Sequence, residues 1–382
     1  MLKSALPIVI IGGGALGLFL AYRLNELFPS KKIIIVDKEK MLGMHSSGRN
    51  TGVLHAGIYY KANSTKAQVC VEGAKRLKEW VSARNLPLNN CGKIIVAQER
   101  DLDAQLDILF TRGIQNGAKL KILKASELTA LFPDAITHSE RCLWSPDTSV
   151  VNPLDVIRQL EIELKAANIT FLLEEELTQV DMGNDTLFLS SGKKIDYCYL
   201  FNCAGIFSNI IAKKFNLGNN LRVLPFKGLY WELVEDCPIK VPTNLYPVPD
   251  LNVPFLGLHF TPSADKNPKV TLGPTATIAL GRENYAGFQS IEPLLALNNL
   301  TLIAKEYILN RGSFRRYVNE QAFMIFKKLI TKEAKKLIPG IEERHLRLSS
   351  KVGIRAQLYD TSKQLMVDDF HCISTHRSTH IL

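Results

Sequence analysis

A glycine-rich turn between an apolar strand and a helix constrains the fold of this 382-residue chain more than any other feature. Residues 7–14 read PIVIIGGG, and apolar β-favouring residues before glycines predict a buried strand that ends in a tight turn. The continuation, ALGLFLAYRLNEL, has leucines at helical spacing, so a helix follows. KKIIIVDK then predicts a second buried strand, which ends at Asp37.

Three glycines of this turn, Gly12, Gly14 and Gly17, form the pattern G-x-G-x-x-G. The first glycine permits the turn, the second lets the backbone approach a pyrophosphate, and the third lets the helix pack close to the strand. The exposed N–H groups and the positive end of the helix dipole then face the phosphates. Asp37 lies 20 residues after Gly17, where this fingerprint places an acid for the ribose hydroxyls. The unit therefore predicts a dinucleotide site.

The segment after the second strand favours FAD over NAD as the dinucleotide. NAD dehydrogenases usually continue with further βα units, whereas residues 46–60 here read SSGRNTGVLHAGIYY, a glycine-rich irregular stretch. Such a stretch suits a flavin, whose longer body extends past the first unit. Its first half, Ser46 to Gly52, is small and polar, as the pyrophosphate and ribityl chain require. Its second half, Val53 to Tyr60, is expected to bring His55 towards the flavin ring.

Length, cysteine usage and charge exclude several other classes. A chain of 382 residues predicts two domains. Seven scattered cysteines without a CxxC pair argue against a disulfide framework and against a metal site, and they favour a cytoplasmic location. The net charge of +10 is spread along the chain, so no nucleic-acid partner is predicted. The densest basic stretch, residues 327–336, is interpreted as a solvated helix face, with loose attraction to anionic lipid as the alternative.

The N-terminus and the apolar runs predict neither a targeting segment nor a membrane span. The first strand begins at Ile8, which leaves no room for a signal or transit peptide. The apolar run over residues 8–22 is short and interrupted by glycines. Any membrane contact is therefore expected to be peripheral, at the inner face of the cell membrane.

The rest of the chain alternates between helical and strand patterns before it turns β-rich. Cys203-Ala204-Gly205 forms a turn without bulky side chains, which either passes close to a bound nucleotide or simply packs tightly. Residues 222–290 predict an antiparallel sheet that forms the floor of a substrate pocket, and the last residues predict short strands and turns. Helices are predicted over 64–85, 100–116, 152–167 and 291–337, and strands over 91–97, 169–177, 186–190 and 195–202.

The whole chain resembles the L-2-hydroxyglutarate oxidase/dehydrogenase family, which belongs to the D-amino-acid-oxidase-like FAD oxidoreductases. The segments that carry this resemblance occur in family order: GGGALG, HSSGRNTGVLHAGIYY, CGKIIVA, FNCAG, PFKGLYW, LYPVPD, FLGLHFT, LGPTA and VGIRAQL. The resemblance implies an α/β fold, α+β overall, in which a Rossmann-like FAD-binding domain is interleaved with an antiparallel-sheet substrate domain. We expect the FAD-binding domain at 1–80, 140–220 and 340–382, and the substrate domain at 81–139 and 221–339.

The resemblance also implies a reaction: oxidation of L-2-hydroxyglutarate, a small dicarboxylate, to 2-oxoglutarate. FAD would take the hydride at N5 and pass the electrons to a quinone or to O2. The family usually continues beyond a segment such as RSTHIL with small residues and a helix that points its N-terminus at the flavin. This sequence is therefore expected to be truncated at its C-terminus relative to the family. Asp37 stands where FAD members of the group more often carry Glu.

The implied chemistry needs a base near neutral pKa and cations for two carboxylates. His259 in FLGLHFT is predicted as the base, with His55 near the flavin, although the sequence does not rank the two firmly. Arg355 is the first candidate for a carboxylate because a guanidinium binds it bidentately, and Lys227 and Tyr246 are weaker candidates. The predicted FAD contacts are Gly12, Gly14, Ala15, Leu16, Gly17, Asp37, Lys38, Ser46, Ser47, Gly48, Asn50, Thr51, Gly52, Leu177, Ala204 and Gly205.

Two alternative functions remain open. A relative that oxidises another 2-hydroxy acid, an amino acid or glycerol 3-phosphate would use the same FAD frame. A truncated flavoprotein that has lost its flavin-binding segment and its activity is the second alternative.

Overall fold

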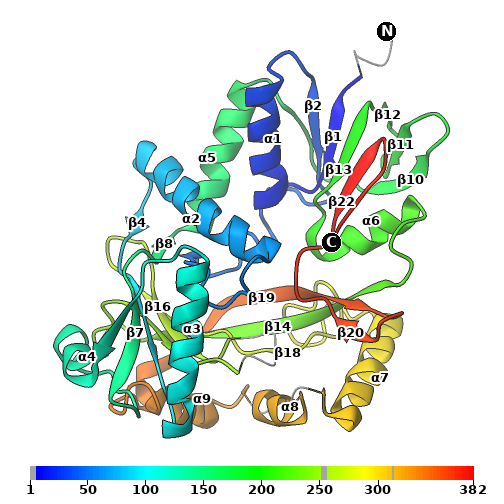
Figure 1. Ribbon diagram of the computed structural model, residues 1–382. Coiled ribbons are helices and arrows are strands. Elements are labelled where there is room, and N and C mark those ends of the chain that lie inside the picture. The colour runs from blue at the N-terminus through cyan, green and yellow to red at the C-terminus, as the bar shows by residue number, and fades with distance from the viewer. Residues whose placement is uncertain (1–5, 251–255, 312–313, 323) are drawn as a thin grey trace. The chain divides into compact units, whose positions relative to one another are not determined.

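The computed structural model describes residues 6–250, 256–311, 314–322 and 324–382 (Figure 1). Part of the predicted PFLGLHFT segment, Pro254 and Phe255, lies outside these residues. The chain divides into two compact units. Unit 1 comprises Met1–Asn50, Pro153–Pro225 and Ile354–Leu382, and unit 2 comprises Thr51–Asn152 and Phe226–Gly353.

The division differs from the predicted one mainly in where residues 51–80 belong. These residues, and residues 140–152, fall in unit 2 rather than beside the dinucleotide motif. The reason is strand pairing: β8 (Ser149–Val151) pairs antiparallel with both β3 (Val53–Leu54) and β4 (Leu88–Asn89). The three-stranded sheet of β3, β8 and β4 joins the start of residues 51–80 to the rest of unit 2. The periodicity of the sequence does not reveal this pairing.

Unit 1 is built on a six-stranded sheet in the order β21-β22-β13-β1-β2-β9. Its pairings are parallel apart from the antiparallel β21–β22 pair, so the sheet is of the predicted Rossmann-like kind. The strands are β1 (Ile8–Ile11), β2 (Ile33–Val36), β9 (Thr170–Leu172), β13 (Tyr199–Asn202), β21 (Cys372–Ser374) and β22 (Ser378–Ile381).

Helices and a second sheet cover the two faces of this sheet. The helices α1 (Ala15–Leu27) and α5 (Pro153–Ala166) pack side by side on one face (Figure 1). The other face packs Val9, Ile11 and Val36 against α6 and a three-stranded antiparallel sheet. These elements are α6 (Ser208–Lys214), β10 (Leu177–Asp181), β11 (Thr186–Leu189) and β12 (Lys194–Asp196).

Two strand predictions in unit 1 are wrong. Residues 195–202 were expected to form a single strand, but they are divided between β12 of the antiparallel sheet and β13 of the parallel one. Residues 169–177 were expected to form a single strand, but they contribute β9 to the parallel sheet and only the first residue of β10 to the antiparallel one. Glu174 lies between them with a φ of 57°. A left-handed residue cannot continue a strand, so the chain leaves one sheet there and enters another.

Unit 2 is built on a mostly antiparallel sheet with the order β14-β17-β16-β15-β5-β7-β6, in which only the β15–β5 pair is parallel. β14 and β19 both run across the boundary between the units in sequence. The strands are β5 (Lys93–Val96), β6 (Lys121–Lys124), β7 (Arg141–Ser145), β14 (Leu221–Leu233), β15 (Asn244–Pro247), β16 (His259–Pro262), β17 (Val270–Gly273), β18 (Thr277–Ile278) and β19 (Leu346–Asp360). β20 (Leu365–Met366) pairs with the end of β19 that belongs to unit 1.

The two faces of β5 show how this sheet is covered. Ile94 and Val96 pack in a core with α4 (Ala125–Leu131) and α9 (Lys327–Lys335), while Ile95 packs with α3 (Asp103–Gln115) on the opposite face. The helical predictions are confirmed by these helices and by α2 (Thr65–Ala83), α5, α7 (Pro293–Leu309) and α8 (Phe314–Ala322). The predicted short strands near the end of the chain are preceded by one long strand, the 15-residue β19, which the prediction missed.

None of the helices in the described part of the chain has both the length and the hydropathy that a membrane crossing requires.

Candidate functional site

The glycine turn of unit 1 has the backbone geometry that the sequence predicts. Gly12 has a φ of 112°, and a Cβ there would lie 2.4 Å from the carbonyl oxygen of Cys203. A Cβ on Gly17 would lie 2.0 Å from the carbonyl oxygen of Gly12. Both positions therefore exclude any other residue. The contact with Cys203 also brings the predicted turn at Ala204 and Gly205 against the glycine turn.

Asp37 and Ser47 tie this turn to the neighbouring segments. The Asp37 carboxylate accepts hydrogen bonds from the backbone N–H of Gly13 (2.5 Å) and of Glu39 (2.8 Å). The Ser47 hydroxyl accepts one from the N–H of Ala15 (2.9 Å), the first residue of α1. The predicted acid thus lies at the glycine turn, and the segment SSGRN lies at the N-terminus of the helix.

The remaining predicted FAD contacts in unit 1 lie around this turn or in its core. Ser46 donates to the carbonyl of Ile354 (3.0 Å), and Asn50 donates to the carbonyls of Ser46 (3.0 Å) and Ser47 (2.9 Å). The Leu177 side chain is buried in the apolar core, so any ligand contact of Leu177 would be made by its backbone. Gly48 cannot carry a side chain, since a Cβ would lie 2.4 Å from the carbonyl oxygen of Gly43.

An acid that the sequence reasoning missed, Glu39, lies next to Lys38. Burial alone would raise the pKa of Glu39, but hydrogen bonds from Lys38 (2.5 Å) and His45 (2.9 Å) hold it below its usual value. The spacing rule pointed to Asp37 at the strand end and gave no reason to look two residues further. Glu39 is a second carboxylate at this edge of the parallel sheet.

The residues at the start of α1 fit the diphosphate of FAD. The N-cap residue Gly14 offers no side-chain cap and the first turn of the helix holds no acidic residue, while the Asp37 carboxylate binds the N–H of Gly13 in the turn before it. The close contacts described above allow only glycine at Gly12, in the turn before the helix, and at Gly17. Backbone N–H groups at a helix N-terminus beside a glycine turn are the donor set that a diphosphate needs.

Strand register in unit 2 gathers a set of polar residues on one face of the sheet. β15 pairs in register with β5, which places Asn244 beside Lys93 and Tyr246 beside Ile95. The pairing of Leu245 with Phe260 places Tyr246 beside His259 on the neighbouring strand. Because paired residues point to the same face, Lys93, Tyr246 and His259 share the face opposite Leu245 and Phe260.

His259 is held in one tautomer and against an aromatic ring. Its Nδ1 lies 2.8 Å from the carbonyl oxygen of Gly257 and therefore carries the proton that it donates there. Its Nε2 is then the basic nitrogen of the neutral ring. The ring stacks on Tyr246 with a centroid distance of 3.8 Å. Both side chains are buried, which fixes the direction of Nε2.

Lys93 is a buried lysine that the sequence reasoning did not select. It is 0% exposed, and its Nζ lies 3.0 Å from Nδ1 of His55. The same Nζ lies 4.5 Å from the centre of the Tyr246 ring and 5.0 Å from that of Tyr59. Burial lowers the pKa of Lys93 to about 7. Among the described residues no carboxylate lies within ion-pair distance of Lys93.

His55 accepts the hydrogen bond of this pair. Its pKa is lowered well below the usual value by burial and by the neighbouring charges of Lys93 and His259, so the ring is neutral. While Lys93 is an ammonium it can only donate, so Nδ1 of His55 then accepts the hydrogen bond from Nζ and Nε2 carries the ring proton. His55 and His259 thus present opposite functions, a donor at Nε2 of His55 and an acceptor at Nε2 of His259.

Three oxygen atoms in the same part of unit 2 are buried without a hydrogen-bond partner in the described structure. They are the Tyr59 hydroxyl, the Asn244 amide oxygen and the Thr261 hydroxyl. Thr261 pairs across from Asn244 by the register of β15 and β16, so it lies on the face that carries Lys93. Burial raises the pKa of Tyr59 well above its usual value, so its hydroxyl is a neutral donor. Buried polar atoms of this kind normally have partners, and their clustering indicates a ligand site.

Other predicted site residues lie outside this group or in the other unit. Lys227 donates to the amide oxygen of Asn284 (2.7 Å), and burial lowers its pKa. Arg355 is half-buried in the unit 1 part of β19, directly after Ile354. Thr51 and Gly52 begin unit 2, where Gly52 accepts a hydrogen bond from Val151 (3.0 Å).

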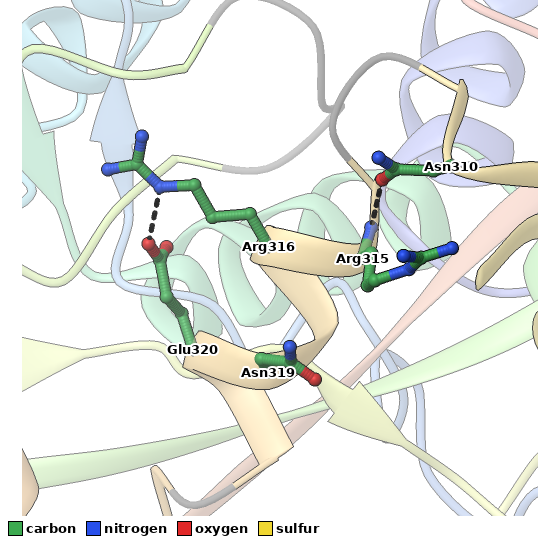
Figure 2. Close-up of a pocket in the computed structure, with 5 residues that line it drawn as sticks. All are labelled: Asn310, Arg315, Arg316, Asn319 and Glu320. Carbon is green, nitrogen blue, oxygen red and sulfur yellow. Dashed lines mark hydrogen bonds and ion pairs between the residues drawn. The ribbon is translucent and has the colours of Figure 1, made fainter. Parts of the chain in front are cut away.

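A pocket of about 520 Å³ lies at the start of α8, away from every predicted site residue. Figure 2 shows that its polar groups bind one another: Arg316 pairs with Glu320 (2.9 Å), and Asn310 accepts from the backbone of Arg315 (3.1 Å). These side chains are exposed, and the Arg315 guanidinium and the Asn319 amide oxygen are bound by residues of α7. The pocket is therefore a surface hollow between helix ends, with no group left over for chemistry.

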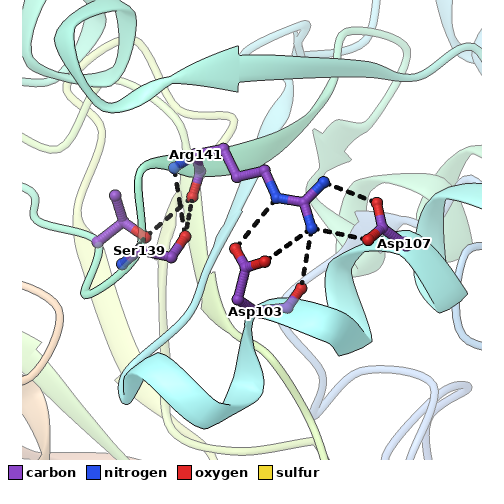
Figure 3. Close-up of polar contacts among 5 residues, drawn as sticks. Asp103, Asp107, Ser139 and Arg141 are labelled. Atoms are coloured by element: carbon purple, nitrogen blue, oxygen red, sulfur yellow. Dashed lines mark hydrogen bonds and ion pairs between the residues drawn. The ribbon is translucent and has the colours of Figure 1, made fainter.

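A second polar cluster joins α3 to β7. Figure 3 shows Arg141 between two carboxylates, with its guanidinium 2.8 Å from Asp103 and 2.7 Å from Asp107. Hydrogen bonds from Arg141 hold the pKa of both carboxyl groups below the usual value. Every charge here is paired, so the cluster fastens a helix to the sheet and is not a catalytic site.

Unit 1 has a parallel sheet with a glycine turn at a helix N-terminus, and unit 2 buries histidines, tyrosines and a lysine on a mixed sheet. This combination is the architecture of a nucleotide-dependent oxidoreductase. The sequence profile of the family described as "FAD dependent oxidoreductase" matches residues 7–377. The chain belongs to this family, and FAD is its cofactor.

Curated relatives narrow the resemblance further. The chain is 32% identical over 381 residues to a mitochondrial L-2-hydroxyglutarate dehydrogenase of Bos taurus. The alignment covers 96% of this chain and 80% of the relative. It is 30% identical to an L-2-hydroxyglutarate dehydrogenase of Indibacter alkaliphilus, covering 98% of this chain and 93% of the relative. The family resemblance predicted from the sequence is confirmed.

Solved structures show the same fold at lower identity. A dithionite-reduced L-alpha-glycerophosphate oxidase from Mycoplasma pneumoniae with FAD bound has a TM-score of 0.74 at 18% identity, covering 98% of this chain and 88% of that chain. An L-proline dehydrogenase from P. horikoshii has a TM-score of 0.65 at 15% identity, covering 93% and 82%. These likenesses confirm the predicted fold class.

Proposed function

We propose that this FAD-dependent oxidoreductase oxidises L-2-hydroxyglutarate to 2-oxoglutarate. Relatives with that name cover nearly the whole chain, and unit 2 carries a base, a hydrogen-bond donor and a cation within one buried group. The observation that carries the proposal is His259, whose Nδ1–H is bound to Gly257 so that Nε2 is the acceptor. Bound FAD supplies the two-electron acceptor for the hydrogen at C2.

In this proposal Nε2 of His259 removes the proton of the 2-hydroxyl group. A neutral imidazole of fixed tautomer is suited to this step, because with Nδ1–H bound to Gly257 its Nε2 is the nitrogen that accepts a proton. The stack on Tyr246 keeps the ring in place while the proton moves. His55 takes the complementary role: its Nε2–H donates to a substrate oxygen, since its Nδ1 is engaged by Lys93. This division supports His259 over His55 as the base.

Arg355, Lys227 and Tyr246 remain proposed contacts of the substrate carboxylates. Arg355 has the planar fork that binds a carboxylate bidentately. Lys227 needs its bond to Asn284 to be exchanged for a substrate oxygen. Tyr246 already serves as the platform under His259, which supports a positioning role for its ring.

The FAD-binding part of the proposal uses the residues around the glycine turn. The N–H groups at Gly14 and Leu16 would hold the diphosphate, beside the N–H of Ala15, whose hydrogen bond the Ser47 hydroxyl accepts. Asp37 with Lys38 would bind the ribose. Ser46 to Gly52 would follow the ribityl chain. The bonds of Ser47 to Ala15 and of Asp37 to Gly13 support these roles, because they place both side chains at the turn.

A flavin-bleaching experiment tests the proposed substrate. Purified protein is mixed anaerobically with L-2-hydroxyglutarate, D-2-hydroxyglutarate, L-lactate, glycine, L-proline and glycerol 3-phosphate in turn, and the oxidised flavin absorbance is followed. We expect rapid bleaching only with L-2-hydroxyglutarate, slowed at least 100-fold in His259→Asn because a general base contributes 10²–10⁴-fold. Faster bleaching with another substrate would replace the proposed one. A colourless protein that takes up no added FAD would instead support the inactive flavoprotein alternative.

The electron acceptor is proposed to be a quinone or O2, reached from a peripheral position on an anionic membrane. The supporting observation is α7, which turns Leu294 (79% exposed) and Ile308 (72% exposed) to solvent while it buries Asn299 and Glu306. The helix also buries Ala296 and Ile303, so apolar residues lie on both of its sides, whereas the usual surface helix keeps them on the buried side. The exposed apolar residues of α7, combined with a net charge of +10, fit the interface of a bilayer that contains anionic lipid.

Co-sedimentation with vesicles tests the membrane contact. The protein should pellet with phosphatidylglycerol–phosphatidylcholine vesicles and stay in solution with pure phosphatidylcholine. The double variant Leu294→Asn, Ile308→Asn should lose this binding, whereas Ile162→Asn, at an apolar position on α5 that is 62% exposed, should keep it. Equal pelleting of both variants would rule out α7 as the contact. Turnover with a soluble quinone analogue against O2 consumption identifies the acceptor.

A further inference from the structure

We infer that Lys93 binds the carboxylate at C5 of the substrate, so that it makes the enzyme specific for dicarboxylates. This inference deepens the proposed function and rests on it for the identity of the substrate. It concerns a residue that the sequence patterns did not single out as functional. The argument starts from the surroundings of the amine in unit 2.

The first step is the lack of any counter-charge. Lys93 is fully buried and points to the face of the sheet shared with Tyr246 and His259. The titratable groups around it are His55, Tyr59, Cys70, Cys91 and Tyr246, all neutral in their usual state. An isolated ammonium in such a place costs several kcal/mol, so proteins keep one only where an anion arrives or where chemistry needs it.

The second step is the set of unsatisfied polar atoms beside the amine. The Tyr59 ring lies 5.0 Å from Nζ, and its buried hydroxyl has no partner among the described residues. Thr261 lies in the same row of the sheet as Lys93 and Asn244, and its hydroxyl is also unsatisfied. A carboxylate has two oxygens with several acceptor sites. One ammonium and hydroxyl donors are the groups that such an anion would use.

The third step is the spacing between Lys93 and the proposed base. The Tyr246 ring adjoins both: its centre is 4.5 Å from Nζ of Lys93 and 3.8 Å from the centre of the His259 ring. A substrate lying along the edge of this ring would place its C2 hydroxyl at His259 and its other end at Lys93. The carbon chain from C2 to C5 of a five-carbon dicarboxylate spans the width of such a ring. A substrate that ends in a methyl group would leave the ammonium buried and unpaired.

The protonation state adds a measurable consequence. Because burial lowers the pKa of Lys93 to about 7, the amine is largely neutral at pH 8 before any anion binds. An arriving carboxylate stabilises the ammonium and draws a proton from solvent. Binding of a dicarboxylate at pH 8 should therefore take up close to one proton, whereas a ligand without the distal carboxylate should take up none.

The test compares a dicarboxylate with its methyl-ended analogue in the FAD-loaded enzyme. Rates are measured with L-2-hydroxyglutarate and with L-2-hydroxypentanoate for wild type, Lys93→Met, Lys93→Gln and Lys93→Arg. In the Met and Gln variants the ratio of kcat/KM for the two substrates should fall about 100-fold, mainly through KM of the dicarboxylate. The Arg variant should keep part of the preference. Lys351→Met, which removes a half-buried lysine elsewhere in unit 2, should leave the ratio unchanged.

A binding measurement separates failure of this inference from failure of the proposed function. Glutarate has both carboxylates but no hydroxyl to oxidise, so calorimetric titration in two buffers of different ionisation enthalpy reports its affinity and proton uptake without turnover. Wild type should bind glutarate with proton uptake at pH 8, and Lys93→Met should bind at least tenfold more weakly without uptake. Equal affinity and equal uptake in the two proteins would overturn the inference. Normal glutarate binding with no oxidation of L-2-hydroxyglutarate would overturn the proposed function alone.

Discussion

The substitution Lys93→Met should make the protein more stable, although it removes a residue of the candidate site. The pKa of Lys93 falls from 10.5 to about 7 on folding, and burial is the main cause. One pKa unit corresponds to about 1.36 kcal/mol, so the folded state loses roughly 5 kcal/mol by keeping this amine buried at pH values below 7. Methionine matches the length of the lysine stem and carries no charge.

Two smaller losses oppose this gain. The hydrogen bond to His55 is lost, at about 1 kcal/mol, and repacking around the thioether costs less than about 1.5 kcal/mol. The variant should therefore unfold with a free energy about 2–3 kcal/mol higher than that of the wild type at pH 7. This sign is the reverse of the usual result for a substitution at a buried position.

The pH dependence has a fixed sign. Between pH 7 and 10.5 the unfolded chain binds a proton at Lys93 that the folded chain does not, so the unfolding free energy of the wild type rises with pH in this window. At pH 9.5 the remaining penalty is about 1.4 kcal/mol. The advantage of Lys93→Met should shrink by about 3 kcal/mol from pH 7 to pH 9.5 and vanish near the upper end.

Urea unfolding at saturating FAD, measured by far-UV circular dichroism at pH 7, 8 and 9.5, checks this prediction. Lys351→Met is the matched control, because the pKa of Lys351 is lowered by burial but raised again by Glu232 and Asp265. Its stability should differ little from the wild type, with a small pH dependence. If Lys93→Met were less stable than the wild type by the same amount at all three pH values, the argument from the uncompensated amine would be refuted.

Three further substitutions test other parts of the structure. Gly17→Ala should weaken FAD binding at least tenfold, because its Cβ would lie 2.0 Å from the carbonyl oxygen of Gly12. The control Gly73→Ala has nothing within 4 Å of its Cβ, so it should leave FAD binding unchanged and the folding stability equal or higher by about 0.5 kcal/mol. Titration of the apoprotein with FAD compares the two variants. Burial lowers the pKa of His380 from 6.5 to about 4, so wild-type stability should fall as pH drops through this window, by about 3 kcal/mol more than in His380→Asn in denaturant titrations. Arg141→Met should lower Tm by loosening α3, and the difference measured by calorimetry should shrink in 1 M salt.

The dinucleotide part of the fold follows from local sequence, because its signals are short-range. The apolar runs at Ile8 and Ile33 and the leucine spacing after Gly14 each act within one element, and the structure has β1, α1 and β2 where they predict. The failure at residues 169–177 has a local cause too, since Glu174 takes a left-handed conformation that residues other than glycine rarely adopt. The prediction took the charged residues 174–176, which follow the apolar run, as a continuation of the same strand.

The boundary of unit 2 was harder to predict because it depends on pairing between distant segments. Val53 pairs with Val150, nearly 100 residues away in sequence, and the pairing involves few residues in each short strand. Such strands have too little periodicity to be recognised before their partners are known. The family resemblance supplied the two-part fold, but not the positions at which the chain passes from one part to the other.

Lys93 shows what periodicity can indicate about a site and what it cannot. The run Lys93–Val96 reads as a buried strand with a lysine at its first position, where a solvent-facing charge would be unremarkable. Only the parallel pairing with β15 shows that this position is covered and shares a face with Tyr246. A charged side chain at such a position lowers the folding stability. A role of Lys93 in binding explains why the chain keeps a lysine there despite this cost. Lys93 therefore destabilises unit 2, and the same residue is expected to set the choice of substrate.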